Sequence, residues 1–186
     1  QPSDVKLYLN QYTPYDQTYY IDADSIVFGN FDNYNKFYVE CQGYGSKGVD
    51  FPEMLWASME DLHEHFELED SVKIPAINSS FMYFEKKDFK VFELAQDIYE
   101  NNKYDMRKAP QKWGRNMNQP DELYLNIALA KLDYKLKKET LVHYPLKGSG
   151  AKHIKQLKEE GKSILSFAGD GMNILPRGKE IYDRLM

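Results

Sequence analysis

The chain has 186 residues, of which 42% are hydrophobic and 28% charged, and this composition is ordinary for a soluble globular protein with one sizeable core. Its formal net charge of −5 and its isoelectric point near 5.4 argue against non-specific binding to nucleic acid. No apolar run approaches the roughly 20 residues of a membrane span, and no signal peptide is visible. The single cysteine, Cys41, excludes an internal disulfide and a cysteine metal cluster, and we expect a cytoplasmic protein.

The first third of the chain alternates turns with short predicted elements. Thr18–Phe28 is rich in aromatic and β-branched residues, which predicts a buried strand. It follows a turn at Thr13–Asp16, where Pro14 restricts the residue before it to extended backbone. The other elements expected here are the end of a helix or an approach segment at 6–10, a second strand at 36–40, a glycine-rich loop at 43–48, and a helix with proline in its first turn at 52–66.

The rest of the chain carries longer helices between short strands. Apolar residues recur at close to helical spacing in 89–99, and the acidic pair Asp121 and Glu122 favours the start of a helix that runs over 123–132. The other expected elements are a strand at 80–84 with 75–78 leading into it, a polar loop at 101–118, a strand at 141–144, a lysine-rich helix at 151–160, a short strand or extended run at 163–167 and a helix at 179–185. Because no internal repeat or linker is visible, we predict one α/β domain over residues 1–186.

Two carboxylates, Asp22 and Asp24, follow the aromatic run Tyr19–Ile21, where that strand should end. Residues i and i+2 of an extended strand lie on the same face, and two carboxylates there repel each other unless a cation or a proton lies between them. Oxygen ligands suit Mg²⁺ or Mn²⁺, so the pair is a candidate metal site. The alternative is an ordinary solvated turn, since Asp often follows a strand.

Four segments resemble, in the same order, the motifs of GT-A nucleotide-sugar glycosyltransferases. The chain looks most like the group of glycogenin-like enzymes and bacterial lipopolysaccharide galactosyltransferases, and the resemblance covers residues 5 to about 150. The segments are the Asp-x-Asp run Pro14–Phe31, the strand Ile77–Phe84, the helix start Pro120–Asn126, and Leu141–Tyr144, which lies where that group carries a metal-binding histidine.

This resemblance implies a GT-A-like, Rossmann-like mixed sheet flanked by helices, in which a divalent cation stabilises the negative charge that gathers on the departing diphosphate. The cofactors implied are Mn²⁺ or Mg²⁺ and a nucleotide-sugar donor, a UDP-sugar in particular, and the acceptor is a glycan, lipid or protein. The implied site residues are Asp22, Asp24 and His143 for the metal, Lys6, Asn78, Ser79 and Lys147 for the donor, and Asp121 and Glu122 for acceptor binding and catalysis. Retention of configuration is implied by the resemblance alone.

These residues also have ordinary structural interpretations. The alternatives are a solvated side chain for Lys6, a non-ligand histidine for His143, the cap of a turn for Asn78 and Ser79, and a helix N-cap pair for Asp121 and Glu122. Members of the resembled family carry further βαβ units before the Asp-x-Asp strand, whereas this strand begins near residue 18. We therefore expect an N-terminally truncated or compact version of the fold.

Two other functions stay open. Haloacid-dehalogenase-like phosphatases also place Asp-x-Asp after a strand, so Asp22 would be the nucleophile and Asp24 the general acid, with Mg²⁺ alongside. Phe167–Asn173 resembles the late metal loop of those phosphatases, and Lys162 resembles their lysine. The remaining alternative is a non-catalytic sugar-binding module of transferase ancestry. The transferase interpretation is the one that also accounts for the strand and helix-start motifs.

Overall fold

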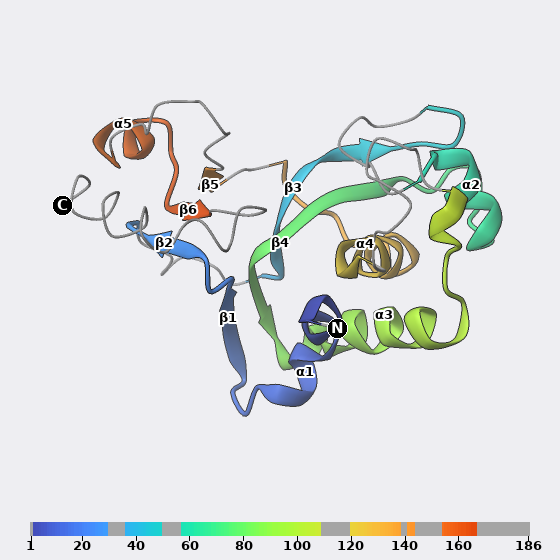
Figure 1. Ribbon diagram of the computed structural model, residues 1–186, viewed down its shortest axis with the longest axis horizontal. Helices are drawn as coiled ribbons and strands as arrows, with labels where there is room; N and C mark the ends of the chain where they lie inside the picture. Colours follow the sequence, from blue (N-terminus) through green and yellow to red (C-terminus); the bar gives the residue numbers. More distant parts are fainter. Residues whose placement is uncertain are drawn as a thin grey trace.

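The computed structural model describes residues 2–29, 36–49, 57–108, 120–138, 141–143 and 154–166 (Figure 1). Within this part of the chain, helices pack on one face of a three-stranded main sheet, and a second three-stranded sheet lies against its other face. Across the same ranges, no helix has both the length and the apolar character needed to cross a membrane.

The main sheet has the strand order β1-β4-β3, and both pairs are antiparallel. Its central strand β4, Ile74–Glu85, is buried along almost all of its length and is flanked by β1, Gln17–Ile21, and β3, Tyr38–Gly45. Tyr83 of β4 lies opposite Tyr19 of β1, with ring centroids 4.8 Å apart. Such aromatic cross-strand pairs stabilise a sheet and help to fix its register.

A bulge interrupts the pairing of β4 with β3 at a polar stretch of β4. Val39 pairs with Met82, whereas the next residue, Glu40, pairs with Asn78. Residues 79–81 of β4 therefore have no pairing partner in β3, although β1 still pairs with the last of them. Bulges redirect side chains and are common beside functional sites, so this irregularity makes the polar stretch of β4 a candidate position for one.

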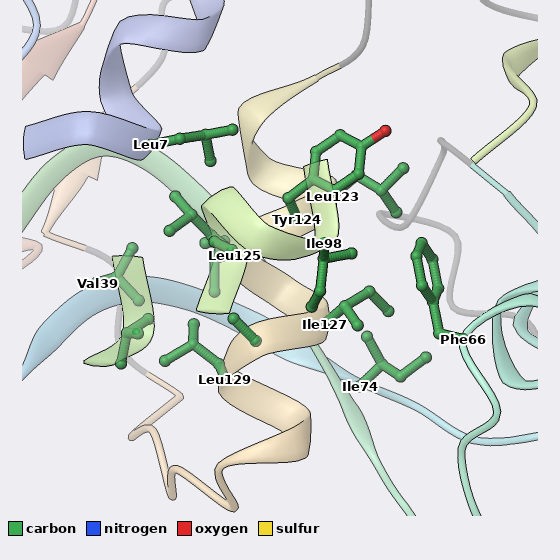
Figure 2. Close-up of a cluster of buried hydrophobic side chains, with 14 of the residues drawn as sticks. Leu7, Val39, Phe66, Ile74, Ile98, Leu123, Tyr124, Leu125, Ile127 and Leu129 are labelled. Carbon is green, nitrogen blue, oxygen red and sulfur yellow. The ribbon is translucent and has the colours of Figure 1, made fainter. Parts of the chain in front are cut away.

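The helices cover one face of the main sheet. The helix α4, Asp121–Lys131, packs against both β4 and α3, Phe89–Asn101, and this central position explains why it is buried on almost every side. Figure 2 shows Leu125 and Leu129 of α4 in the same apolar cluster as Val39 of β3. The other described helices before β5 are the 3-10 helix η1, Pro2–Tyr8, followed by α1, Leu9–Tyr12; then α2, Met59–His65, and the 3-10 helices η2, Lys86–Asp88, and η3, Met106–Lys108.

The second sheet has the order β2-β6-β5 and contains a parallel pair, β5 and β6. Its strands are β2, Ser25–Val27, β5, Val142–His143, and β6, Ile164–Ser166, and α5, Ile154–Glu159, lies between β5 and β6 in the chain. An apolar cluster joins this sheet to the main one, and its buried members are Tyr38, Phe81, Tyr83, Leu141, Val142 and Ile164.

The structure confirms the α/β class and most of the predicted elements that fall on described residues. The helices expected at 89–99 and 123–132 are α3 and α4, and the strand expected at 80–84 is part of the twelve-residue β4. The helix expected at 179–185 lies outside the described residues, as do residues 52–56 of the helix expected at 52–66.

Three predicted elements are wrong in their extent. The helix expected at 52–66, with proline in its first turn, begins at Met59, because Ser58 caps it by accepting from the backbone N–H of Asp61 at 3.1 Å. The strand expected at 18–28 is two strands, because the chain turns after Asp22 and the backbone N–H of Ser25 donates to the carbonyl oxygen of Asp22 at 3.1 Å. The glycine-rich loop expected at 43–48 begins as strand, because β3 continues to Gly45. A Cβ atom at Gly45 would collide with the side chain of Met59 in α2, so this glycine permits close packing inside a strand.

Candidate functional site

Three segments far apart in the sequence meet where β1 ends beside the bulge of β4. Asp22 is the first residue after β1, and its backbone N–H donates to the carbonyl oxygen of Ser80 at 2.9 Å. That bond ties the end of β1 to the bulge. Asp24 lies in the turn that follows, between β1 and β2. The first turn of α4 supplies Asp121 and Glu122. The sheet and the helix thus present carboxyl groups to one region.

Lys6 supplies a positive charge in the midst of these carboxyl groups. Its ammonium nitrogen lies 2.9 Å from both carboxylate oxygens of Asp22 and donates to Oγ of Ser79 at 3.1 Å. The side chains of Lys6 and Asp22 are 18% and 19% exposed, so the ion pair is largely shielded from water. It links the N-terminal helix η1 to the ends of two strands.

Ser79 is the centre of the network because it contacts a residue from each neighbouring segment. Its hydroxyl donates to Oδ2 of Asp121 at 2.7 Å while it accepts from Lys6. Its backbone N–H donates to Oε1 of Glu122 at 3.0 Å. This N–H is free for a side chain because the bulge takes Ser79 out of the pairing with β3. The polar run Asn78–Ser80 inside a buried strand therefore supplies hydrogen bonds to the carboxyl groups of α4 through Ser79.

Burial perturbs the two carboxyl groups at the start of α4. It raises the pKa of Asp121, and the Lys6 charge and the hydrogen bond from Ser79 oppose that rise only in part. Burial also raises the pKa of Glu122, and the adjacent charge of Asp121 raises it further. These two groups therefore hold a proton more readily than ordinary carboxyl groups, which is a property of catalytic acids and bases.

Tyr20 is a member of the site that was not predicted from the sequence. Its hydroxyl donates to Oδ1 of Asp22 at 2.6 Å, and burial together with this bond raises its pKa. The negative charges of Asp121 and Asp24 contribute to the same rise, so both carboxylates lie within electrostatic reach of the Tyr20 hydroxyl. The alternation of a strand is the signal that could have identified Tyr20, because it shares a face with Asp22.

The donor atoms that a metal ion would need are available at Asp24 rather than at Asp22. Oδ1 of Asp24 is buried and has no hydrogen-bond partner among the described residues, whereas Asp22 is held by Lys6 and Tyr20. The described residues contain no group of three or more His, Cys, Asp or Glu that could hold an ion. The chemistry of these donors suits a hard cation with Asp24 as its direct ligand and Asp22 beside it.

Of the three other predicted site residues, Asn78, His143 and Lys147, the first two are not part of this hydrogen-bond network among the described residues. Oδ1 of Asn78 accepts from the backbone N–H of Ser80 at 2.9 Å, which is the turn-capping role. His143 lies in β5, where its backbone pairs with Leu165 of β6, and Lys147 lies outside the described residues. The network therefore brings together Lys6, Asp22, Ser79, Asp121 and Glu122, with Asp24 in the adjoining turn.

Comparisons with known proteins do not assign the chain to a family. No protein-family model matches it, and no curated protein and no solved structure is significantly similar to it. The function is therefore argued from the site itself.

Proposed function

We propose that the chain is a metal-dependent glycosyltransferase domain that moves a sugar from a nucleotide-diphosphate donor to a glycan, lipid or protein acceptor. The supporting observation is the single network that joins Lys6, Asp22, Ser79, Asp121 and Glu122. The network connects three of the four segments that carry the sequence resemblance, namely Pro14–Phe31, Ile77–Phe84 and Pro120–Asn126. These segments are far apart in the chain and meet only in the folded structure. The carboxyl groups and the cation of the network provide the types of group that such a transfer requires.

The proposal includes a GT-A-like fold around the site. The second sheet supports the metal assignment, because β2 directly follows Asp24 and β5 carries His143. Both strands pair with β6, so the chain returns His143 to the same small sheet as the Asp-x-Asp turn. A third metal ligand from β5 is therefore compatible with this topology.

The proposed reaction breaks the bond between the anomeric carbon and the diphosphate, and negative charge then gathers on the departing oxygen. A bound Mn²⁺ or Mg²⁺ supplies a positive charge that stabilises this oxygen. Lys6 adds a second positive charge that the protein already holds in place. The roles proposed by residue are the metal for Asp24 and His143 as direct ligands, with Asp22 beside it, the diphosphate for Lys6 and Lys147, and the sugar for Asn78 and Ser79.

Asp121 and Glu122 are proposed to act on the acceptor. A hydroxyl group that attacks the anomeric carbon must lose its proton, and a carboxylate within hydrogen-bond reach can accept it. The raised pKa of both groups makes either one a better proton acceptor than an ordinary carboxylate. Ser79 keeps both carboxyl groups in a fixed orientation through its hydroxyl and its backbone N–H.

The experiment that tests the proposal measures release of UDP from UDP-glucose and UDP-galactose, with and without Mn²⁺. We expect metal-dependent release, as slow hydrolysis or as transfer when an acceptor is supplied, and a loss of about a hundredfold in Asp24→Asn. The matched control is Asp16→Asn, because the Asp16 side chain is 84% exposed and its carboxylate pairs with Lys86 at 2.6 Å on the surface.

The same preparation separates the alternatives. Failure to bind or cleave any UDP-sugar, with or without metal, would overturn the transferase proposal. Hydrolysis of p-nitrophenyl phosphate that is lost in Asp22→Asn would identify a phosphatase. Binding of a UDP-sugar without turnover, even with a panel of sugar acceptors, would identify the non-catalytic module.

A further inference from the structure

Glu40 of β3 is a carboxylic acid in an apolar setting. It is 1% exposed, and its neighbours Val39 and Cys41 are also buried. The backbone N–H of Val142 in β5 donates a hydrogen bond to its carboxyl group. Its other oxygen, Oε2, is buried and has no hydrogen-bond partner among the described residues. An unpartnered buried polar atom costs free energy, so a ligand that supplied the missing bond would be favoured there.

Glu40 faces the second sheet and not the helices. Val39, the preceding residue, lies in the apolar cluster around α4, and neighbouring residues of a strand point to opposite faces (Figure 2). Tyr38, two residues before Glu40, packs in the cluster that joins the two sheets and includes Val142. Glu40 therefore lies between the sheets at the level of the bulge, where its register partner is Asn78.

The bulge brings Glu40 within electrostatic reach of the network around Ser79. Burial raises the pKa of Glu40 to about 7, Lys162 after α5 acts against this rise, and the negative charge of Glu122 adds to it. Glu122 is the group that accepts a hydrogen bond from the backbone N–H of Ser79. The two glutamates thus belong to one electrostatic environment, although one comes from β3 and the other from α4.

We infer that Glu40 is a further binding residue of the site, whose Oε2 atom hydrogen-bonds a hydroxyl group of the sugar that the nucleotide carries. A hydroxyl suits this position because it can both donate and accept, so it pairs with the carboxyl group in either protonation state. The inference rests on the proposed function, which makes the nucleotide-sugar the ligand. It assigns Glu40 to the sugar, whereas Lys6 and the aspartates are assigned to the diphosphate and its cation.

The test compares the affinities of UDP, UDP-glucose and UDP-galactose, all with Mn²⁺, by calorimetry on the protein and two variants. Glu40→Met removes both carboxyl oxygens at similar side-chain length, and Glu40→Gln keeps an oxygen for the N–H of Val142. We expect Glu40→Met to weaken binding of the preferred UDP-sugar about tenfold, the loss of one hydrogen bond, and to change UDP affinity less than about twofold. Glu40→Gln should lose about threefold, because its amide still donates to a hydroxyl.

Asp88→Asn is the matched control for a change at a buried carboxyl group. Asp88 is 3% exposed and lies beyond the end of β4, where it accepts from the hydroxyl of Tyr134 at 2.9 Å. Its replacement should leave the ratio of UDP affinity to UDP-sugar affinity unchanged. If Glu40→Met fails to fold, the ratio of UDP affinity to UDP-sugar affinity in Glu40→Gln tests the inference instead.

The outcomes distinguish this inference from the proposed function. An unchanged ratio in both Glu40 variants, or an equal loss for UDP and UDP-sugar, would overturn the role of Glu40 and leave the transferase proposal in place. Absence of any UDP binding by the unaltered protein would overturn the transferase proposal and this inference with it. A selective loss for the UDP-sugar in the Glu40 variants alone supports the inference.

Discussion

Lys6 and Asp22, sixteen residues apart in the chain, form an ion pair in which the ammonium nitrogen lies 2.9 Å from both carboxylate oxygens. The pair ties the N-terminal helix η1 to the end of β1, and Lys6 extends the link to Ser79 on β4. Because both side chains are less than one-fifth exposed, removal of either one leaves the other charge poorly solvated. The pair thus has a structural role whatever ligand the site binds.

The first prediction is that Lys6→Met lowers the free energy of unfolding by about 2–3 kcal/mol, because it leaves the Asp22 charge without its partner. Urea denaturation at neutral pH measures the change. The control is Lys86→Met, since Lys86 pairs with Asp16 at 2.6 Å on the surface, where both side chains are more than half exposed. That exposed pair should contribute less than about 1 kcal/mol. Equal losses in the two variants would show that the Lys6 pair is no more stabilising than a surface pair.

The second prediction concerns Ser79→Ala. The change removes a hydroxyl that accepts from Lys6 and donates to Asp121, so Asp121 loses a donor while it stays buried. We expect a loss of about 1–3 kcal/mol in the free energy of unfolding. Ser71→Ala, at an exposed turn position, should be within about 0.5 kcal/mol of the unaltered protein. Thermal or urea unfolding that cannot tell the two variants apart would contradict a central role for the Ser79 hydroxyl.

The two long helices of this fold are predictable from the sequence, but the start of α2 and two features of the strands are not. The helical spacing of apolar residues and the acidic start of α4 indicate α3 and α4 correctly, because both signals are local. The carboxylates after Ile21 indicate the end of β1 correctly, but β2 is not predicted as a separate strand, because Ile26 and Val27 extend the same β-branched pattern beyond the polar turn. Glycine is disfavoured in strands, so the sequence predicts a loop at Gly45. Its place in β3 is explained only by the close packing of Met59 against it.

Most members of the site are predictable from the sequence, but the contacts between them are not. Asp22, Ser79, Asp121 and Glu122 are selected by motif, yet nothing in the sequence indicates that one serine contacts both acidic residues. The bond from Lys6 to Ser79 spans 73 residues and exists only because η1 packs beside the bulge. Tyr20 is missing from the predicted site, as is Glu40, the residue inferred to bind the sugar, which in sequence is an isolated acid at the end of a predicted strand.

The third prediction concerns the metal-binding role proposed for His143. An imidazole must be neutral to bind a cation, so affinity for Mn²⁺ in the presence of UDP should fall as the pH drops below roughly 6.5. Carboxylates alone would retain the ion to a pH nearer ~4. His143→Ala should therefore weaken Mn²⁺ binding and remove the upper part of this pH dependence, as measured by calorimetry. His65→Ala, in α2, is the control. An unchanged affinity and pH profile in His143→Ala would place the third ligand elsewhere.

The last prediction is a pH dependence of stability that originates at Glu40. Burial raises the pKa of Glu40 to about 7 in the folded protein, from an ordinary value of 4.5. Between these two values the folded state holds a proton that the unfolded state has lost, so the free energy of unfolding decreases as the pH rises through this window. The total contribution is on the order of 1–3 kcal/mol, and it is fully present below pH 4.5 and lost above about pH 7.

Glu40→Gln carries no proton-linked charge, so its unfolding free energy should vary less between pH 5 and pH 8 than that of the unaltered protein, and it should be the more stable of the two at pH 8. Asp121 and Glu122 also have raised pKa values, so a decrease of the same sign should persist in this variant at reduced size. The control is Asp70→Asn, because Asp70 pairs with Lys47 on the surface and its pKa is lowered. Urea denaturation at half-unit steps of pH gives both curves. Parallel curves for Glu40→Gln and the unaltered protein would show that the pKa of Glu40 is the same in the folded and unfolded states. That result would contradict the rise in pKa expected from the burial of this carboxyl group.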